Sequence, residues 1–181
     1  MRTVCTILLV AALAPAAAAQ TPAPAPSANP ISDGIRGQWN GVKRNIQRSA
    51  DLMTAEGYEY RPVDGVRTFG EILAHVAGAN YAICAAAKPE KTPFAEDHFE
   101  KTATTRPAII KATADSIAYC DAVYAALTDA SAGQMVQSPF GPNQMTRTAA
   151  LVLNIGHNNE HYGNLVTYLR MNGIVPPSSR R

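Results

Sequence analysis

Two histidines stand four residues apart near the C-terminus of this 181-residue chain, in the segment IGHNNEHYGN at residues 155–164. On an α-helix, positions i and i+4 lie on one face a turn apart, so His157 and His161 can approach a single metal ion. The pair alone is weak support for a metal, because hydrogen-bonded histidines in a helical core have the same spacing. The segment therefore indicates either a metal site or a polar part of the core.

The same segment contains the literal pattern H-x-x-E-H, which also occurs in inverted zinc peptidases. In those enzymes the glutamate is the general base, and a further acidic ligand comes from downstream. Residues 162–181 contain no Asp or Glu. The missing third ligand disfavours the peptidase interpretation.

A third histidine favours a metal site of a different kind. His75 lies in the segment TFGEILAHVAGAN and falls on the inward stripe of a predicted helix. Three buried imidazoles without a common partner would leave several polar nitrogens unsatisfied. Around one divalent ion, three neutral nitrogens are satisfied together and coordination positions stay open, as in catalytic zinc sites. We therefore predict that His75, His157 and His161 bind one ion.

Two glutamates are candidate general bases beside this predicted site. A bound divalent ion can polarise an oxygen or lower the pKa of a water ligand, so hydrolysis is the simplest chemistry that needs no cosubstrate. Glu160 is the neighbour of His161 and should point about 100° away from it around the helix, so a solvated carboxylate is its alternative role. Glu71 precedes His75 by four residues in a predicted capping box, where we expect it to be occupied with the helix end.

Other polar and aromatic residues have weaker claims to a role. The last predicted helix contains three asparagines that could orient an imidazole, or else face solvent and neighbouring helices: Asn154, Asn158 and Asn164. His98 lies among acidic residues and is interpreted as a surface residue. Tyr168 is predicted to be a core residue, and Trp39 either packs in the core or lines the mouth of a cavity.

The elements that must position these residues are all predicted to be helices. Apolar residues recur at helical spacing in four segments that are bounded by caps, glycine or proline: residues 32–55, 68–87, 105–129 and 146–172. Residues 88–104 form a long connection with room for a short helical turn, and residues 138–144 form a turn-rich loop. No segment is convincing as a strand. The sequence therefore predicts an all-α, antiparallel four-helix bundle, a fold whose ligand sites lie between facing helices.

The first 19 residues have the pattern of a signal peptide. Arg2 is basic, residues 4–13 are apolar, and small residues precede Gln20, so we predict cleavage after Ala19, with an uncleaved anchor as the alternative. The apolar run is too short for an ordinary membrane-spanning helix. We therefore expect an exported protein, periplasmic or secreted, with a disordered Pro/Ala-rich spacer at residues 20–30 and one domain at residues 31–181.

Charge and cysteine content limit the partners that we expect. The formal charge of +2 at pH 7 becomes +1 without Arg2, and basic residues are scattered apart from the last two. This balance gives no reason to propose nucleic acid or an acidic membrane, so a small molecule is the expected partner, with a homodimer possible. Cys84 and Cys120, the two cysteines of the mature chain, form either a disulfide or two buried thiols.

Two longer motifs give this chain a family resemblance. TFGEILAHVAGAN together with HNNEHYGNLVTYLRMNGIVPPSS resembles the DinB superfamily of small four-helix-bundle proteins, from about residue 31 to the C-terminus. The resemblance implies a site for a divalent ion, typically nickel or zinc, on His75, His157 and His161. Gly163 also matches, where a small residue would let another helix approach closely. Many relatives are cytosolic, whereas this chain has the pattern of an exported protein.

Three functions are compatible with these observations. The first is a metal-dependent hydrolase or transferase of unknown substrate. The second is a non-catalytic protein that binds a metal or a small ligand, and the third is a structural bundle whose histidines are only hydrogen-bonded. Some members of the superfamily resemble transferases or isomerases that use cytosolic thiols, which are harder to supply in an oxidising, exported location. Imidazole suits Zn, Ni, Cu and Fe alike, so the preference for Zn or Ni comes from the resemblance.

Overall fold

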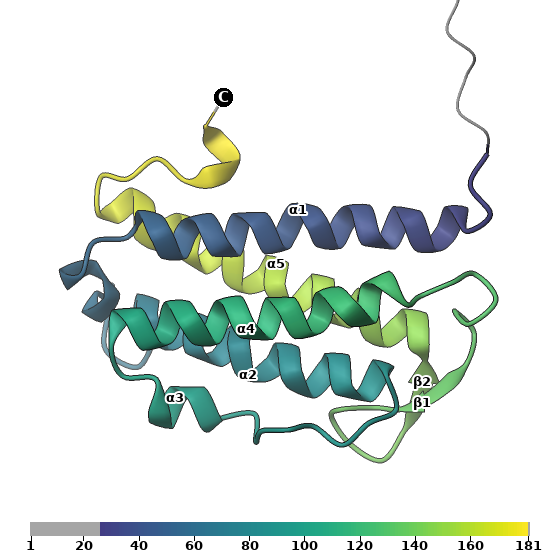
Figure 1. Cartoon of the computed structure of the whole chain (residues 1–181). Coiled ribbons are helices and arrows are strands. Elements are labelled where there is room, and N and C mark those ends of the chain that lie inside the picture. Colours follow the sequence, from purple (N-terminus) through teal and green to yellow (C-terminus); the bar gives the residue numbers. More distant parts are fainter. Residues whose placement is uncertain (1–25, 181) are drawn as a thin grey trace, which may run out of the picture.

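Four long helices dominate the computed structural model, which describes residues 26–180 (Figure 1). They are α1 (Pro30–Leu52), α2 (Phe69–Ala87), α4 (Arg106–Ala125) and α5 (Arg147–Met171). Both α1 and α2 pack against α4 and α5. The predicted all-α four-helix bundle is therefore confirmed. Of the packed pairs, α1 with α4 and α2 with α5 are antiparallel, whereas α2 runs parallel to α4 and α1 runs parallel to α5 (Figure 1).

The parallel course of α2 and α4 depends on the long connection between them. In Figure 1 the chain leaves the end of α2, returns along the bundle through α3 (His98–Thr102), and enters α4 beside the start of α2. This short helix is the helical turn for which the connection had room. A long connection of this kind is how a bundle accommodates parallel neighbouring helices.

A small β-hairpin joins α4 to α5 and was missed by the sequence analysis. Strand β1 (Met135–Gln137) pairs antiparallel with β2 (Gln144–Thr146), and the predicted turn-rich loop connects them. Strands of three residues are too short to show a periodic pattern. The helix ends also differ slightly, because α1 ends at Leu52 rather than residue 55 and α4 ends at Ala125 rather than residue 129.

The N-terminal predictions fall mostly outside the described residues. The predicted signal peptide and residues 20–25 are among the residues that are not described, as is Cys5. Helix α1 begins at Pro30, within the stretch predicted as a spacer, and the Asn29 side chain accepts a hydrogen bond from Asp129 N at 3.0 Å. Between residues 26 and 180, no helix is both long and apolar enough to cross a membrane.

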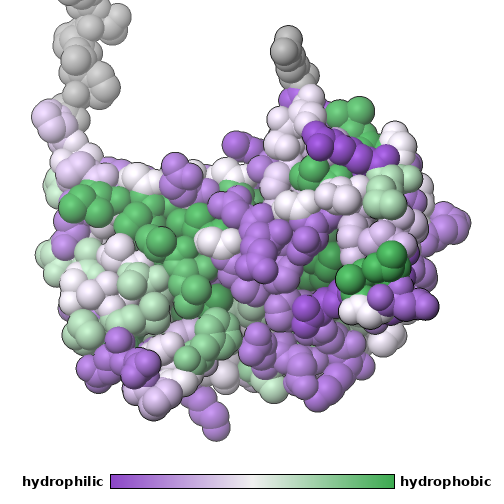
Figure 2. Space-filling view, turned by 180° about the vertical axis from the view of Figure 1, so that it is seen from behind, coloured by the Kyte–Doolittle hydropathy of each residue, from purple (hydrophilic) through white to green (hydrophobic). Residues whose placement is uncertain are grey.

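Apolar residues are unevenly distributed over the surface opposite to that of Figure 1. Figure 2 shows apolar residues gathered on the half where α1 and α5 begin, and hydrophilic residues over much of the other half. Ile31 at the start of α1 is 63% exposed, and Val152 in the first half of α5 is 50% exposed. The surface of the bundle is therefore not uniformly polar.

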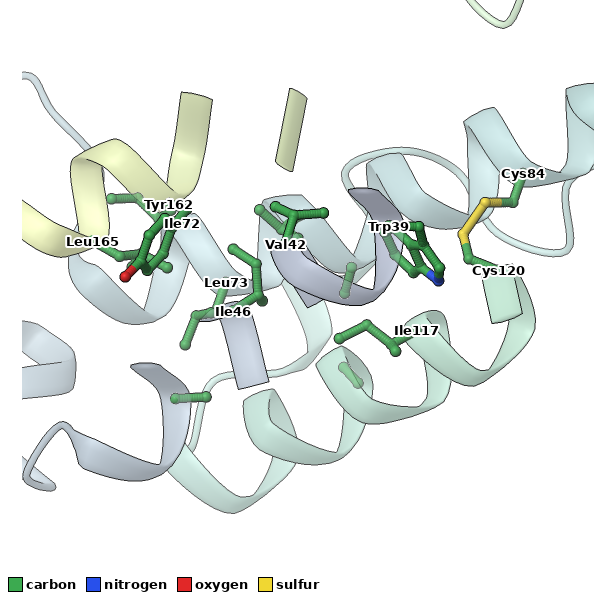
Figure 3. Close-up of a cluster of buried hydrophobic side chains, with 14 of the residues drawn as sticks. Trp39, Val42, Ile46, Ile72, Leu73, Cys84, Ile117, Cys120, Tyr162 and Leu165 are labelled. Atoms are coloured by element: carbon green, nitrogen blue, oxygen red, sulfur yellow. A yellow bond between two sulfur atoms is a disulfide. The ribbon is translucent and has the colours of Figure 1, made fainter. Parts of the chain in front are cut away.

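Large apolar side chains from all four helices fill the bundle (Figure 3). The fully buried residues include Ile46 of α1, Leu73 of α2, Ile117 of α4 and Leu165 of α5. Burying a side chain of this size stabilises the fold by about 1.5–3 kcal/mol. These contacts hold α2 and α5, the helices that carry the three histidines, in one position relative to each other.

Trp39 was predicted either to pack in the core or to line the mouth of a cavity, and it packs in the core. Its ring stacks on Tyr124 with a centroid distance of 4.7 Å and an angle of 5° between the planes. The indole Nε1 donates a hydrogen bond to Asp121 at 2.6 Å, so its polar atom is satisfied. The residue joins α1 to α4 and does not line the cavity beside the histidines.

The helices that carry the histidines have well-defined ends. Thr68 and Glu71 form the predicted capping box of α2, with Glu71 N donating to Thr68 Oγ1 at 3.1 Å and Thr68 N donating to Glu71 Oε2 at 2.7 Å. Thr146 caps α5 through Ala149 N at 3.1 Å. After α5, Gly173 has φ +72°, a left-handed conformation that glycine adopts without steric cost.

A disulfide between Cys84 and Cys120 joins α2 to α4. Both residues are fully buried, and Figure 3 shows the bond at one end of the apolar cluster. Of the two alternatives left open by the sequence, the structure therefore has the disulfide. The bond links the two parallel helices directly, beyond the contacts of their apolar side chains.

The backbone of the long connection approaches α2 closely at Gly78. A Cβ atom at this position would lie 1.8 Å from the backbone oxygen of Glu96, in the connection that precedes α3. Only glycine allows the connection to pack against the helix at this distance. The close approach predicted at Gly163 is wrong, because a Cβ there would have no atom within 4 Å.

We predict that Gly78→Ala destabilises the protein by about 1–3 kcal/mol, because the added methyl group must displace the backbone at Glu96. Urea unfolding followed by circular dichroism measures the change. Gly163→Ala is the matched control: it adds the same methyl group to an open helical position and should be neutral or stabilising by up to about 1 kcal/mol. Equal effects of the two substitutions would contradict the close contact.

We predict that loss of the disulfide costs about 3–4 kcal/mol, because the bond closes a loop with a sequence separation of 36 residues. The measurement is urea unfolding of the oxidised protein beside the variant that carries both Cys84→Ala and Cys120→Ala. Peptide mass spectrometry without reductant should find the two cysteines in one cross-linked fragment. Two free thiols in protein isolated under oxidising conditions would show that the bond does not form.

Candidate metal centre

The three predicted histidines meet between α2 and α5. His75 Nε2 lies 3.2 Å from His157 Nε2, and His161 Nε2 also lies 3.2 Å from His157 Nε2. One ring nitrogen from each residue falls within 4.8 Å of the other two. His75 is separated from the pair by more than 80 residues, so this convergence depends on the packing of the two antiparallel helices.

The three nitrogens fit the requirements of a divalent transition metal. At zinc–nitrogen distances of 2.0–2.1 Å, tetrahedral coordination separates two ligand nitrogens by about 3.3 Å. The two nitrogen–nitrogen distances of 3.2 Å agree with that value. A set of three imidazoles suits zinc, nickel, copper or iron and leaves further coordination positions for other ligands. The donor set therefore fits the predicted ion.

Burial keeps two of the three rings neutral. Desolvation, and after it the neighbouring His161 and His75, lower the pKa of His157 to about 4. The pKa of His161 is likewise lowered to about 4, first by desolvation and then by His75. Neutral imidazoles offer a lone pair to a cation. Within residues 26–180, the Nδ1 atoms of His157 and His161 are buried without a hydrogen-bond partner.

A carboxylate that the sequence analysis did not assign lies next to His75. Glu100 Oε1 is 2.9 Å from His75 Nδ1, and Glu100 Oε2 accepts from Arg67 Nε at 2.9 Å. Burial raises the pKa of Glu100, but hydrogen bonds from Arg67 and His75 outweigh it and leave the pKa below its ordinary value. Glu100 is on α3, in an acidic and aromatic stretch of the connection. No periodicity there indicates which residue faces His75.

A cavity of about 700 Å³ opens beside His161. It lies between α2, α5 and the loop before α2, and Glu100 of α3 also lines it. Its lining includes both predicted general bases and two arginines: Arg61, Arg67, Glu71 and Glu160. Asn164 and Tyr168 also line it. Tyr168 was predicted to be a core residue, and it is buried, with 6% of its surface exposed. The cavity has room for a small molecule.

The two candidate bases differ in how their carboxylates are engaged. Glu71 accepts from Thr68 N at 2.7 Å in the capping box and lies 3.6 Å from the Arg61 guanidinium. Glu160 is exposed and has no ion pair or hydrogen bond within residues 26–180. In the same part of the chain, neither glutamate is hydrogen-bonded to one of the three histidines. Glu160 is therefore the carboxylate that is freer to accept a proton.

The asparagines of α5 do not orient the histidines in the described structure. Asn158 Nδ2 donates to Asn80 Oδ1 at 2.8 Å, and Asn154 Nδ2 donates to Tyr124 Oη at 3.3 Å. Both asparagines are fully buried, facing α2 and α4, because neighbouring positions of a helix point in different directions. Asn164 is exposed at the cavity. The suggested contact of Asn154 or Asn158 with an imidazole is thus absent.

His98 lies apart from the three-histidine group. Its ring is half-buried rather than fully solvated, and it stacks on Phe94 with a centroid distance of 4.8 Å. The group of residues that could bind an ion contains the other three histidines and not His98. His98 is therefore useful as a control histidine.

Comparisons with known proteins agree with this fold. The family profile described as the DinB superfamily matches residues 38–165. A DinB-like protein from Bacillus cereus ATCC 10987 is 21% identical, with 80% of this chain and 95% of that chain covered and a TM-score of 0.66. No curated protein matches the sequence.

Two further solved structures are similar and have functional descriptions. YfiT from Bacillus subtilis, described as a probable metal-dependent hydrolase with an unusual four-helix bundle topology, is 16% identical, covers 85% of this chain and 94% of its own, and has a TM-score of 0.61. A mycothiol-dependent maleylpyruvate isomerase is also 16% identical, with a TM-score of 0.61. The alignment covers 74% of this chain and 60% of the isomerase. At these identities the similarity shows the fold alone.

We predict that the metal-free protein loses stability as the pH falls from about 6.5 to about 4. In this window the unfolded chain protonates His157 and His161 at their ordinary pKa, while the folded chain keeps both rings neutral because each pKa is about 4. The unfolded state therefore binds more protons and is favoured by acid. Urea unfolding in chelator at several pH values should show a loss of up to about 3 kcal/mol for each of the two rings, because one pKa unit corresponds to about 1.4 kcal/mol.

The variant with both His157→Gln and His161→Gln is the comparison for this pH series. Its stability should depend less on pH across the same window, because the two depressed pKa values are gone. Parallel pH profiles for the wild type and the double variant would contradict the assigned cause.

Proposed function

Because this chain belongs to the DinB superfamily, we propose that its three histidines bind a divalent metal ion, zinc or nickel, for hydrolysis or group transfer on a small molecule. The observation that carries the proposal is the convergence of the ring nitrogens of His75, His157 and His161, two pairs of which lie 3.2 Å apart. The family match at residues 38–165 includes all three histidines.

Hydrolysis is the reaction that these residues support best. An ion on three imidazoles would act as a Lewis acid toward an oxygen of the substrate or of water, which is the chemistry that hydrolysis requires. The 700 Å³ cavity beside His161 would hold the substrate, and the free carboxylate of Glu160 in its wall would accept a proton. Glu71 is the second candidate base, but its carboxylate would have to give up the hydrogen bond from Thr68 N that caps α2. YfiT is described as a probable metal-dependent hydrolase, which supports the same class.

A metal-binding or small-ligand-binding protein without turnover is the alternative function. It is supported by the same three-histidine group, which can hold an ion whether or not a reaction follows. The same ligands would serve, and no general base would be needed. A thiol-dependent transfer, as the name of the isomerase suggests for that protein, would require a thiol cosubstrate.

Export and self-association are also proposals. The pattern of residues 1–19 supports an exported protein, and the disulfide between Cys84 and Cys120 is compatible with an oxidising compartment such as the periplasm. N-terminal sequencing of the protein from a periplasmic fraction would test cleavage after Ala19. The exposed apolar area in Figure 2 is where a homodimer could form, and light scattering during size-exclusion chromatography measures its mass.

We predict near one zinc or nickel ion per chain in protein purified without a tag or chelator, since the three nitrogens form one site. Elemental mass spectrometry measures the number of metal ions per chain. His75→Ala and His157→Ala should each lose the ion, because each removes one of three ligands, whereas His98→Ala should keep it. Wild-type protein that is metal-free and takes up neither zinc nor nickel on titration would refute the proposed site.

Turnover distinguishes the enzyme from the binding protein. A panel of ester, amide and thiol-acceptor substrates should reveal an activity that chelator abolishes and added metal restores. In that case Glu160→Gln should lower kcat by about 10²–10⁴-fold with the ion still bound, because a general base contributes a factor of that size. An ion-loaded protein that turns over none of these classes favours the binding function.

A further inference from the structure

Glu100 makes a hydrogen bond to one histidine of the site. Its Oε1 atom lies 2.9 Å from His75 Nδ1, on the opposite side of the ring from the Nε2 atom that faces His157. The His75 side chain is 12% exposed and that of Glu100 is 23% exposed, so water competes only weakly for this contact. The Glu100 carboxylate is also fixed on its other side by Arg67 Nε at 2.9 Å.

These contacts determine which nitrogen of His75 carries the proton. Arg67 Nη2 is 3.3 Å from His75 Nδ1 and could donate to it only if Nδ1 were unprotonated. A carboxylate oxygen would then face a nitrogen lone pair at 2.9 Å, which is repulsive. With the proton on Nδ1, His75 donates to Glu100, and Arg67 Nη2 can instead donate to Glu100 Oε1 at 3.4 Å. The second arrangement pairs His75 Nδ1, Glu100 and Arg67 with one another without repulsion, so the Nδ1–H tautomer is favoured.

We propose that Glu100 is a positioning residue that accepts the Nδ1 proton of His75 and thereby directs the Nε2 lone pair of that ring toward the metal site. This inference deepens the proposed function and rests on its three-histidine site. His157 and His161 have no Nδ1 partner within residues 26–180, so His75 is the ligand whose tautomer and ring orientation the protein fixes in advance. A carboxylate behind a histidine ligand also makes the ring a stronger donor to a metal.

The fold places Glu100 behind His75 through the connection between α2 and α4. Helix α3 has only five residues, and none of them is buried in the core. Its position is therefore determined by a few contacts that its own residues and the preceding residues make with α2. Gly78 lies one helical turn after His75 and lets the backbone at Glu96 approach α2. Phe99 stacks on Tyr81 of α2 with a centroid distance of 5.6 Å. These two contacts bring α3 against α2 beside His75.

Nuclear magnetic resonance of the metal-free, full-length protein tests the proposal directly. A long-range nitrogen–proton correlation spectrum distinguishes the two tautomers of a histidine, and the His75 signals are assigned by their loss in His75→Gln. The wild type should show His75 as the Nδ1–H tautomer. In Glu100→Ala, the Nε2–H tautomer should become populated, because the acceptor for the Nδ1 proton is gone. A wild-type His75 with its proton on Nε2 would overturn the proposal without any variant.

Metal affinity gives a second readout that does not depend on activity. The Kd for zinc, measured by competition with a chromogenic chelator, should rise about 10–100-fold in Glu100→Ala, the size expected for loss of a carboxylate behind a ligand. Glu96→Ala removes a carboxylate from the same connection, one without a hydrogen bond to His75. This control should change Kd by less than about fivefold, as expected for a solvent-exposed charge.

Equal effects of Glu100→Ala and Glu96→Ala on Kd, with an unchanged tautomer, would overturn the positioning role. Failure of the proposed function is visible separately in the wild type. If the wild type takes up no zinc or nickel, the metal site itself is refuted, whatever the tautomer of His75. If the wild type binds the ion but has no turnover, only the catalytic part of the proposed function is removed, and the role of Glu100 stands.

Discussion

The partial burial of three imidazoles between α2 and α5 is the constraint on which the site depends. Removal from water disfavours the protonated, charged form of an imidazole, so His157 and His161 have a pKa of about 4 and are neutral at pH 7. Each neutral ring still has one donor and one acceptor, and rings that face one another through Nε2 cannot satisfy all of them. The surroundings must therefore hold the helices in register despite this cost. The buried hydrogen bond from Asn158 to Asn80 does so between α5 and α2, and the disulfide from Cys84 holds α2 to α4.

The sequence predicted the parts of this arrangement that are local to a helix. The spacing of His157 and His161 places them on one face of a helix whatever the rest of the chain does. The capping box of Thr68 and Glu71 is a pattern of four residues, and it predicts where α2 begins. His75 was found because it falls on the inward stripe of its helix. The pairing of α2 with α5 was not itself visible in the sequence. It followed from the physical requirement that three buried imidazoles share one partner, and the structure brings them together.

The parts that the sequence did not predict depend on contacts between distant segments. Glu100 reaches His75 only because the connection returns along α2, and that path requires the missing side chain at Gly78. A glycine inside a helix gives no sign of which segment will approach it, and the close approach was wrongly assigned to Gly163. The asparagines show the same limit. Periodicity correctly places Asn158 in a helix near the histidines, but the packing of α2 determines that it faces Asn80 rather than an imidazole.

The charges around the cavity are almost all compensated within the protein. Arg67 pairs with Glu100 at 2.9 Å, and Arg61 lies 3.6 Å from Glu71. Within residues 26–180, this leaves Glu160 as the carboxylate of the cavity wall without an ion pair. The cavity is thus slightly negative when the neutral histidines hold no ion, and it would become positive once they hold a divalent one. The sign of the field that a charged small molecule meets in the cavity is therefore determined by the three histidines rather than by the arginines.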